Sequence, residues 1–320
     1  MIKAGVIGLG KWGLNHVKTF KKIRCKLVGI SDVDLKKKDL AMEYGTEFFY
    51  DYHKLLERVD AVTVATPTDT HFRIVKECLR NNKDVLVEKP IALTTRESEE
   101  LVTLAKKNNL ILSVGYLFRF NNAVRRAKEL IKDVGEIQYI TCRYIHSTKP
   151  PRKDSGVILN LGVHAIDIIT FIFGKKPVKV YTKKKNLLSK DFEDSAMAIL
   201  DYKDFFANIE LSCVHPEKKR DMWIIAEREK VYVDFLNQKI IRYPIVVSYD
   251  EVIRGDPVEE KIIRNEPLKD ELQYFIELVE KHKEMGLIPS EISGRENIDT
   301  TKICELLIKS AEENKEIKVK

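Results

Sequence analysis

Short apolar runs alternate with longer amphipathic stretches through the first 120 residues of the chain. The runs predict buried strands, and the stretches between them predict helices. Strands are expected at 2–7, 26–31, 60–65, 84–88 and 110–115, and helices at 13–22, 34–44, 69–82 and 94–108. This alternation is typical of right-handed βαβ units, in which helices cover both faces of a parallel sheet.

The pattern changes after about residue 121. Helices are expected at 122–132, 156–173, 268–283 and 295–313, and strands at 136–146, 177–183, 193–201, 204–212, 221–227, 230–236 and 239–247. Neighbouring strands without crossover helices indicate an open, mostly antiparallel sheet. We therefore predict an α/β protein in which residues 1–120 form a doubly wound parallel sheet of the Rossmann type and residues 121–320 form an α+β domain for substrate binding and assembly.

A glycine-rich turn follows the first predicted strand. Its glycines have the spacing GxGxxG, which permits a tight turn, close approach to a pyrophosphate and close packing of helix on strand. Asp32 ends the next strand, about 20 residues further on, where its carboxylate can accept hydrogen bonds from ribose hydroxyls and would repel a 2′-phosphate. The turn therefore predicts a site for NAD rather than NADP. The residues expected to bind the cofactor here are Gly8, Gly10, Lys11, Trp12, Gly13 and Asp32.

Composition narrows the class of protein. The hydrophobic content is 44%, the charged content is 33%, and no apolar run approaches the length that a membrane span needs. The five cysteines are scattered without metal-binding spacing, so we expect no metal site and a reducing cytoplasm, in keeping with a chain that opens directly into a strand. The modest net charge of +7 suits an anionic small molecule better than nucleic acid.

Lys89 stands at the end of the predicted strand 84–88 and is followed by proline. Because ligands bind at the carboxyl ends of parallel strands, this lysine should face the cofactor site rather than bulk solvent. A lysine so placed can exchange a proton with a substrate hydroxyl. The alternative is that it binds a phosphate or a nearby carboxylate.

A second polar group lies in the segment 156–167. On a helix, Asn160, His164 and Asp167 share one face, while most of their neighbours are apolar. A polar stripe on a buried helix needs partners. It marks either a catalytic group or a hydrogen-bonded network that packs the two domains together.

These segments together resemble the family of glucose-fructose oxidoreductase and inositol 2-dehydrogenase. The resemblance extends over essentially the whole chain. It rests on the glycine turn 8–13, on Ala65-Thr66-Pro67-Thr68 with His71, on Glu88-Lys89-Pro90 and on the segment 156–167.

The family resemblance implies reversible hydride transfer between a sugar-like alcohol and nicotinamide. Lys89 would hold the reacting hydroxyl and His164 would carry its proton. Four further residues, together with Lys89, would line the cofactor site, namely Thr66, Thr68, His71 and Glu88. The peptide bond before Pro90 is expected to be cis.

One position departs from the usual family pattern. Many relatives carry aspartate four residues before the catalytic histidine, where this chain has Asn160. Asparagine at this place resembles members that oxidise the 3-hydroxyl of UDP-N-acetylhexosamines or the corresponding uronic acids. An amide cannot accept a proton, but Asn160 can orient a sugar hydroxyl or His164, so the resemblance implies a catalytic role for Asn160 beside Lys89 and His164. Asn160, Asp167 and Arg119 are predicted to bind the substrate. Other cations that could meet a diphosphate or carboxylate are Arg125, Arg126, Arg152 and Lys153.

Two alternatives remain open from the sequence. One is a dehydrogenase for inositol, a free sugar or a diol. The other, from a different class, is a cofactor-binding regulatory protein that does not catalyse. In either case the open sheet would expose apolar surface in a monomer, so we expect a homodimer or homotetramer assembled through the C-terminal sheet.

Overall fold

The computed structural model describes residues 1–147 and 154–319. Within them the chain divides into two compact units, Met1–Leu117 with Leu268–Thr301, and Phe118–Pro267 with Lys302–Lys320. The sequence placed all of residues 121–320 in the second domain. The structure corrects this assignment for Leu268–Thr301, which packs with the first unit.

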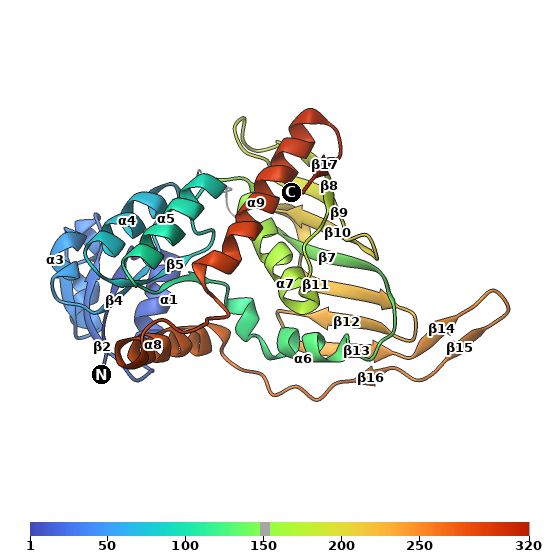
Figure 1. Ribbon diagram of the computed structural model, residues 1–320, viewed down its shortest axis with the longest axis horizontal. Helices are drawn as coiled ribbons and strands as arrows, with labels where there is room; N and C mark the ends of the chain where they lie inside the picture. The colour runs from blue at the N-terminus through green and yellow to red at the C-terminus, as the bar shows by residue number, and fades with distance from the viewer. Residues whose placement is uncertain (148–153, 320) are drawn as a thin grey trace. The chain divides into compact units, whose positions relative to one another are not determined.

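The first unit, fully described over residues 1–117, contains a six-stranded parallel sheet with the order β3-β2-β1-β4-β5-β6 (Figure 1). Its strands are β1 (Lys3–Ile7), β2 (Lys26–Ser31), β3 (Glu47–Phe49), β4 (Ala61–Val64), β5 (Asp84–Glu88) and β6 (Leu112–Gly115). Its helices are α1 (Lys11–Phe20), α2 (Asp39–Glu43), α3 (Tyr52–Leu56), α4 (Thr68–Arg80), α5 (Thr95–Lys107) and α8 (Pro267–Met285), and α9 (Gly294–Glu313) begins here.

The strand order reverses between β1 and β4. From β1 the chain runs outward through β2 to β3, and it then returns to pair β4 on the other side of β1. Such a switch point is where open parallel sheets bind ligands, beyond the carboxyl ends of the strands. The glycine turn and the Thr66 loop both begin at this point, directly after β1 and β4.

The helix α8 belongs to the first unit for physical reasons that its sequence spacing does not reveal. Its apolar face buries Leu272, Phe275, Ile276 and Val279. On the same helix, His282 lies 3.4 Å from the buried Asp84 carboxylate, and Lys283 forms an ion pair of 2.7 Å with Asp60. These contacts attach the helix to β5 and to the loop before β4.

The second unit is built on a mixed sheet. Among the described residues nine strands form it, in the order β16-β13-β12-β11-β7-β10-β9-β8-β17. They are β7 (Ile137–Ser147), β8 (Lys179–Lys185), β9 (Ser195–Asp201), β10 (Phe206–Ser212), β11 (Val214–Ala226), β12 (Lys230–Asp234), β13 (Lys239–Tyr243), β16 (Val258–Glu259) and β17 (Ile317–Lys318). Most pairs are antiparallel, but β7 and β10 are parallel.

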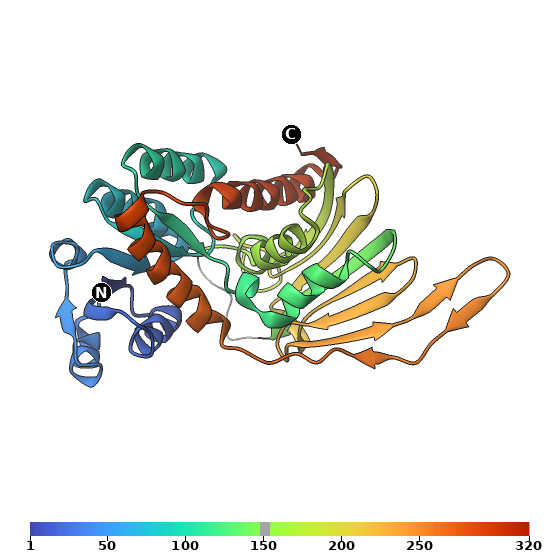
Figure 2. The same cartoon turned by 60° about the horizontal axis from the view of Figure 1, so that its bottom comes forward.

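Helices α6 (Asn122–Leu130) and α7 (Val163–Phe173) cover one face of this sheet, as Figures 1 and 2 show. Asn121 begins α6 by accepting hydrogen bonds from the backbone N–H groups of Ala123 and Val124. The inward side chains of β7, β10 and β11 alternate with outward ones, so the core of the unit lies between the sheet and these helices.

The predicted fold class is confirmed, while several elements differ in detail. The helix expected at 34–44 is a 3-10 turn, Leu35–Lys37, followed by the short α2, because few of its side chains are buried. The sequence analysis missed β3 and α3. The strand expected at 239–247 is divided into β13 and β14 (Ile245–Val247). β14 forms a hairpin with β15 (Val252–Arg254), which was not predicted, and the hairpin extends from the edge of the sheet (Figure 1). Over residues 1–147 and 154–319, no helix has both the length and the apolar character needed to cross a membrane.

Candidate active site

The glycine turn has the geometry that its motif predicted. Gly8 adopts φ +91°, and a Cβ added there would lie 2.7 Å from the carbonyl oxygen of Ala65. A Cβ on Gly13 would lie only 1.8 Å from the carbonyl oxygen of Gly8, whereas one on Gly10 would meet no atom within 4 Å. Side chains are therefore excluded where the turn packs on itself, and open space remains at the middle glycine.

The beginning of α1 fits a phosphate group. Gly10 is the N-cap residue, and no side chain caps the helix there. The first N–H groups of α1 therefore lack side-chain acceptors, and a helix N-terminus of this kind attracts anions. Gly10 and Lys11 are exposed and Trp12 is half-buried, so the turn is accessible to a dinucleotide.

Asp32, directly after β2, is fixed in place by three donors. Its carboxylate accepts hydrogen bonds from Leu9 N at 2.7 Å, Lys37 Nζ at 2.8 Å and Asp34 N at 2.9 Å. Burial raises the pKa of this carboxyl, but the hydrogen bonds from Lys37 and the two N–H groups outweigh burial and leave the pKa below its usual value. Asp32 is thus a fixed anion beside the glycine turn.

Lys89 follows the fully buried strand β5 and is itself only 6% exposed. The preceding residue, Glu88, accepts a hydrogen bond from Lys89 N at 3.3 Å, and its other oxygen lies 3.0 Å from His16 Nε2 on α1. Burial raises the pKa of Glu88, yet the hydrogen bond from His16 and the positive charges of His16, Lys89 and His71 lower it overall. The buried carboxylate of Glu88 therefore lies next to the backbone N–H of Lys89.

His71 connects the loops after β4 and β5. Its Nδ1 lies 2.8 Å from the carbonyl oxygen of Pro90, and its Nε2 lies 3.0 Å from that of Thr66. Carbonyl oxygens only accept, so each bond requires a protonated ring nitrogen. Thr66 is half-buried and its hydroxyl accepts a hydrogen bond from Thr70, while Thr68 is buried at the start of α4. The expected cis peptide bond between Lys89 and Pro90 is confirmed.

In the second unit, α7 begins with a π-helical turn, Ile158–Gly162, that holds Asn160. The turn is anchored by Glu193, whose carboxylate accepts from Ile158 N at 3.0 Å and whose carbonyl accepts from Val157 N at 2.9 Å. Single π turns within helices frequently occur at functional sites. Asn160 is half-buried there, whereas His164 and Asp167 are buried on α7.

His164 lies among aromatic rings. It stacks on Tyr144 of β7, with ring centroids 5.2 Å apart and planes 8° apart. Phe118 meets the imidazole edge to face at 5.5 Å. These contacts fix the plane of the imidazole, as a group that transfers a proton to a defined position requires.

Two residues predicted to bind substrate, Arg119 and Asp167, form an ion pair with one another. Arg119 donates from Nε and Nη2 to Asp167 Oδ1 at 2.9 and 2.6 Å, and the two side chains are 5% and 1% exposed. Such a pair joins the turn before α6 to α7. The pair lies within the second unit, and a role of either residue in substrate binding stays a prediction.

The other cations considered from the sequence also have partners. Arg125 donates to the carbonyl of Arg119, and Arg126 pairs with Glu129 and Glu260. Arg152 and Lys153 lie outside the described residues. Sequence reasoning missed His16, although it stands three residues after Gly13.

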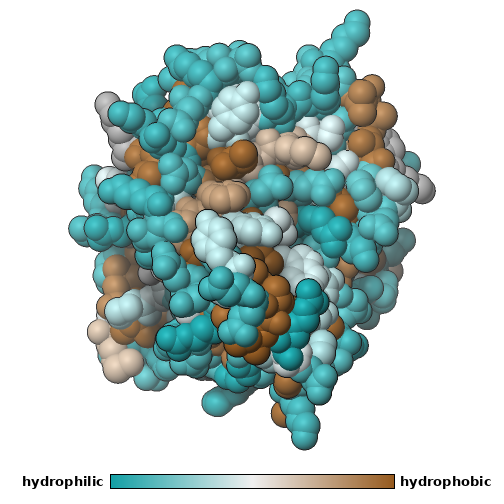
Figure 3. All heavy atoms as spheres, turned by 90° about the vertical axis from the view of Figure 1, so that its right-hand side faces the viewer, coloured by the Kyte–Doolittle hydropathy of each residue, from teal (hydrophilic) through white to brown (hydrophobic). Residues whose placement is uncertain are grey.

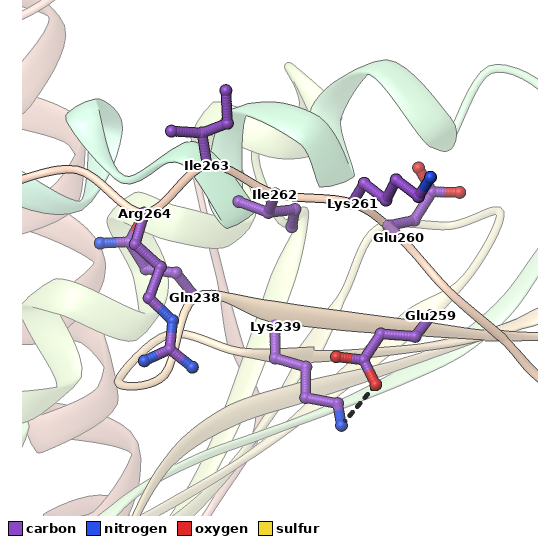
Figure 4. Close-up of a pocket in the computed structure, with 8 residues that line it drawn as sticks. All are labelled: Gln238, Lys239, Glu259, Glu260, Lys261, Ile262, Ile263 and Arg264. Atoms are coloured by element: carbon purple, nitrogen blue, oxygen red, sulfur yellow. Dashed lines mark ion pairs between the residues drawn. The ribbon is translucent and has the colours of Figure 1, made fainter.

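A cavity of about 480 Å³ in the second unit contains none of the predicted site residues. It is lined by Gln238, Lys239 and the segment Glu259–Arg264, and Figure 4 shows Lys239 and Glu259 pointing toward one another as an ion pair of 2.7 Å. Glu260 is held by Arg126 and Arg242. Ion pairs within the protein thus hold three charged residues of this lining, namely Lys239, Glu259 and Glu260.

The structure brings the predicted site residues together as two sets, one in each unit. The cofactor residues and Lys89 surround the carboxyl ends of β1, β2, β4 and β5, and Asn160, His164, Asp167 and Arg119 lie on or beside α7. In the described part of the chain, no group of three or more His, Cys, Asp or Glu side chains could hold a metal ion.

Known proteins extend these observations. Residues 2–116 match the model of an oxidoreductase family with an NAD-binding Rossmann fold, and residues 124–232 match the GFO/IDH/MocA C-terminal domain. UDP-N-acetylglucosamine 3-dehydrogenase of Acidithiobacillus ferrooxidans is 28% identical, over 88% of this chain and 90% of that protein. Myo-inositol 2-dehydrogenase of Thermotoga maritima is 29% identical, over 63% of this chain and 65% of that protein.

Solved structures agree with this assignment. The crystal structure of the Acidithiobacillus ferrooxidans enzyme has a TM-score of 0.85 at 25% identity, and 98% of each chain is covered. A scyllo-inositol dehydrogenase of Lactobacillus casei, solved with NAD(H) and scyllo-inositol, shares the fold with a TM-score of 0.80 at 21% identity and 99% coverage of each chain. Because both family models match in order along it, the chain belongs to the GFO/IDH/MocA family of oxidoreductases and is a dehydrogenase with an NAD-binding Rossmann unit.

Proposed function

We propose that the protein oxidises the 3-hydroxyl of a UDP-N-acetylhexosamine, or of its uronic acid, with NAD as the oxidant. The observation that carries the reaction class is the position of Lys89, which is buried, follows a strand of the Rossmann unit and lies next to the Glu88–His16 pair. The substrate class is supported by Asn160 in place of the usual aspartate and by the Acidithiobacillus ferrooxidans relative.

The residues divide the chemistry between them. Bound NAD supplies the nicotinamide ring that accepts the hydride. Lys89 donates a hydrogen bond to the reacting hydroxyl and stabilises the negative charge that develops on its oxygen. His164 takes the hydroxyl proton, and its ring plane is set by Tyr144 and Phe118. Asn160 cannot accept a proton, so it orients the sugar or the imidazole.

Asp32 supports NAD over NADP as the cofactor. Its carboxylate is ionised and fixed by Leu9 N, Asp34 N and Lys37. An adenosine ribose with two free hydroxyls can donate to it, whereas a 2′-phosphate would meet like charge. Lys37 compensates part of that charge, so we expect a preference for NAD rather than exclusion of NADP.

The first experiment measures the absorbance at 340 nm of NADH that the purified protein forms from NAD. The panel comprises UDP-N-acetylglucosamine, UDP-N-acetylgalactosamine, their uronic acids, myo-inositol and glucose. Absorbance that grows only with a UDP-sugar is the expected result. Turnover of myo-inositol alone would favour the activity named for the Thermotoga maritima relative. A flat trace for every compound, with NAD bound, would favour the non-catalytic alternative.

We also propose a homodimer or homotetramer formed through the outer face of the nine-stranded sheet. Tyr139 and Phe206 stack there at 5.7 Å, and Met197 and Ile199 lie on the same face with 61% and 47% of their surface exposed. Figure 3, which views the side to which β14 and β15 project, shows hydrophobic residues lying together among hydrophilic ones. Phe206→Glu should shift the mass measured by light scattering toward the monomer, whereas wild-type mass in this variant would contradict the interface.

The cysteines support a cytoplasmic location. All five lie in the described part of the chain and all are free thiols. Four are buried. The fifth, Cys25, is half-buried, and this partial burial raises the pKa of its thiol to about 11. Unpaired thiols are usual where the surroundings keep them reduced.

A further inference from the structure

Arg220 contacts the aromatic ring on which the candidate catalytic histidine stacks, although Arg220 is 56 residues away from that histidine in sequence. It is on β11 and pairs across the strands with Tyr144 of β7. Its guanidinium carbon lies 4.5 Å from the centroid of the Tyr144 ring, and the same ring stacks on His164. Arg220, Tyr144 and His164 therefore form one contiguous group on the helix-covered side of the sheet.

Arg220 differs from the neighbouring arginines in its charge balance. Arg119 pairs with Asp167, Arg143 with Asp221 and Arg242 with Glu229. Among the described residues no carboxylate pairs with Arg220, and its Nε is buried without a hydrogen-bond partner.

A guanidinium N–H group that is buried without an acceptor is costly, because folding removes water from that group and supplies no hydrogen-bond partner in return. Proteins keep such groups where a ligand supplies the acceptor. The planar guanidinium matches the geometry of phosphate and carboxylate oxygens, and contact with an aromatic face orients it. The acceptor that fits Arg220 is therefore an oxyanion.

We propose that Arg220 binds the anionic group of the substrate while His164 acts on its hydroxyl. The anion is either the diphosphate of a nucleotide sugar or the carboxylate of a uronic acid, and it makes charged sugars preferred over neutral polyols. This inference rests on the proposed function in taking a sugar alcohol as the substrate. It assigns recognition of the anion to a residue of β11 rather than to Arg119.

Binding measurements test the inference without requiring turnover. Titration calorimetry on the full-length chain should use UDP as the diphosphate probe and glucuronate as the carboxylate probe, with NAD as a reference. Arg220→Met should weaken binding of one probe by about 10- to 100-fold, the amount expected for lost charge-assisted hydrogen bonds. NAD affinity should not change. The probe that is affected identifies the anion.

Two further variants make the result specific. Lys219→Met removes the adjacent positive charge of β11, whose side chain points to the opposite face of the strand, and it should change affinity by less than about twofold. Arg220→Lys keeps the charge without the planar fork and should give an intermediate loss. Since it also retains much of the packing on Tyr144, it remains informative if Arg220→Met does not fold.

The outcomes separate a binding role from a purely structural one. If Arg220 only supports Tyr144, Arg220→Met will lower turnover of charged and neutral sugars alike and leave UDP and glucuronate affinity unchanged, which overturns the inference. It is also overturned if the wild type binds neither probe. If Arg220-dependent binding is found but no sugar reduces NAD, the anion-binding role of Arg220 stands and the proposed reaction fails.

Discussion

The two units differ in which groups contact and balance the charged side chains of their candidate site residues. In the Rossmann unit, Glu88 and His71 bond to groups in the loops after neighbouring strands and to His16 on the first helix. In the second unit, Arg119 is neutralised by Asp167 on a different element. Arg220 has an aromatic ring beside it, and no carboxylate within the described residues pairs with it. Short motifs after β4 and at the end of β5 supplied His71, Glu88 and Lys89 of the first arrangement, although its His16 lies 72 residues from Glu88. The second arrangement depends on strand register and helix packing.

This difference shows how far a residue type can be trusted as a sign of function. Glu88 and Pro90 adjoin Lys89 in sequence and also form part of its surroundings in the structure. The short motif therefore indicates much of the environment of Lys89. Arg119 was selected because it is a cation in a family-like segment, and its counter-charge is 48 residues away. Substitutions can show whether the Rossmann residues form a functional site and whether Arg119 serves only to stabilise the fold through its pair with Asp167.

The largest expected effect is on turnover. Lys89→Met and His164→Gln should each lower kcat by about 10²- to 10⁴-fold, because each removes a proton-transfer or charge-stabilising group. NAD affinity should stay near the wild-type value. Lys106→Met, a change at a lysine in the last turn of α5, is the control and should be neutral. Stopped-flow measurement of NADH at saturating substrate checks this, and wild-type kcat in both site variants would contradict the mechanism.

The next effect concerns stability in the second unit. Arg119→Met should reduce the free energy of unfolding by about 3–5 kcal/mol, because it leaves the buried Asp167 carboxylate without its partner. The double variant Arg119→Met with Asp167→Leu should recover much of that loss, and Arg126→Met, at a more exposed arginine, should cost no more than about 1 kcal/mol. Urea unfolding provides the values. A stable Arg119→Met variant with weakened substrate binding would restore Arg119 to substrate recognition.

The glycine turn allows a matched pair of variants. Gly13→Ala places a Cβ 1.8 Å from the carbonyl oxygen of Gly8 and should cost about 1–3 kcal/mol of stability through overpacking. Gly10→Ala meets no atom within 4 Å and should leave stability unchanged while weakening NAD binding. Thermal melting and NAD titration distinguish the two effects. Equal stability of both variants would mean that the turn relaxes around the added carbon.

We expect the preference for NAD over NADP to depend on the carboxylate of Asp32. Asp32→Asn removes the fixed anion and should shift the ratio of NADP to NAD affinity by about tenfold toward NADP. Asp34→Asn is the matched control, since Asp34 accepts from Lys36 N and should not affect this ratio. Fluorescence titration with both reduced cofactors measures it. An unchanged ratio would assign the selectivity to another residue.

The smallest effect is a pH dependence of stability in the Rossmann unit. The pKa of Glu88 is lower in the folded protein than the value of about 4.3 that is usual for an exposed glutamate. Its stabilising contribution is therefore fully present above that unfolded value and is lost as the pH falls through the folded pKa.

The variant Glu88→Gln isolates this contribution. The difference in Tm between wild type and Glu88→Gln should be constant from pH 8 to about 5 and should shrink below about 4. Burial raises the pKa of Asp84, so Asp84→Asn should show the opposite trend, with the wild type gaining stability relative to the variant on acidification. A parallel shift of both variants would contradict the assignment.

The sequence by itself determined the Rossmann fold, the glycine turn, Asp32 and the position of Lys89. These features depend on residues that are close in sequence or stand at the ends of strands whose apolar pattern is unambiguous. Helices α8 and α9 also followed from periodicity, although the packing of α8 with the first unit did not. For that reason the domain boundary at residue 120 described the chain order rather than the compact units.

Only the tertiary structure decided which charges are balanced. Asp167 meets Arg119, and Tyr144 meets both His164 and Arg220, because α7, β7 and β11 pack together in a particular register. A shift of one residue in that register would turn Arg220 to the other face of the sheet. The sequence lists the cations, but the counter-charge of each depends on contacts between distant segments, which local patterns do not encode.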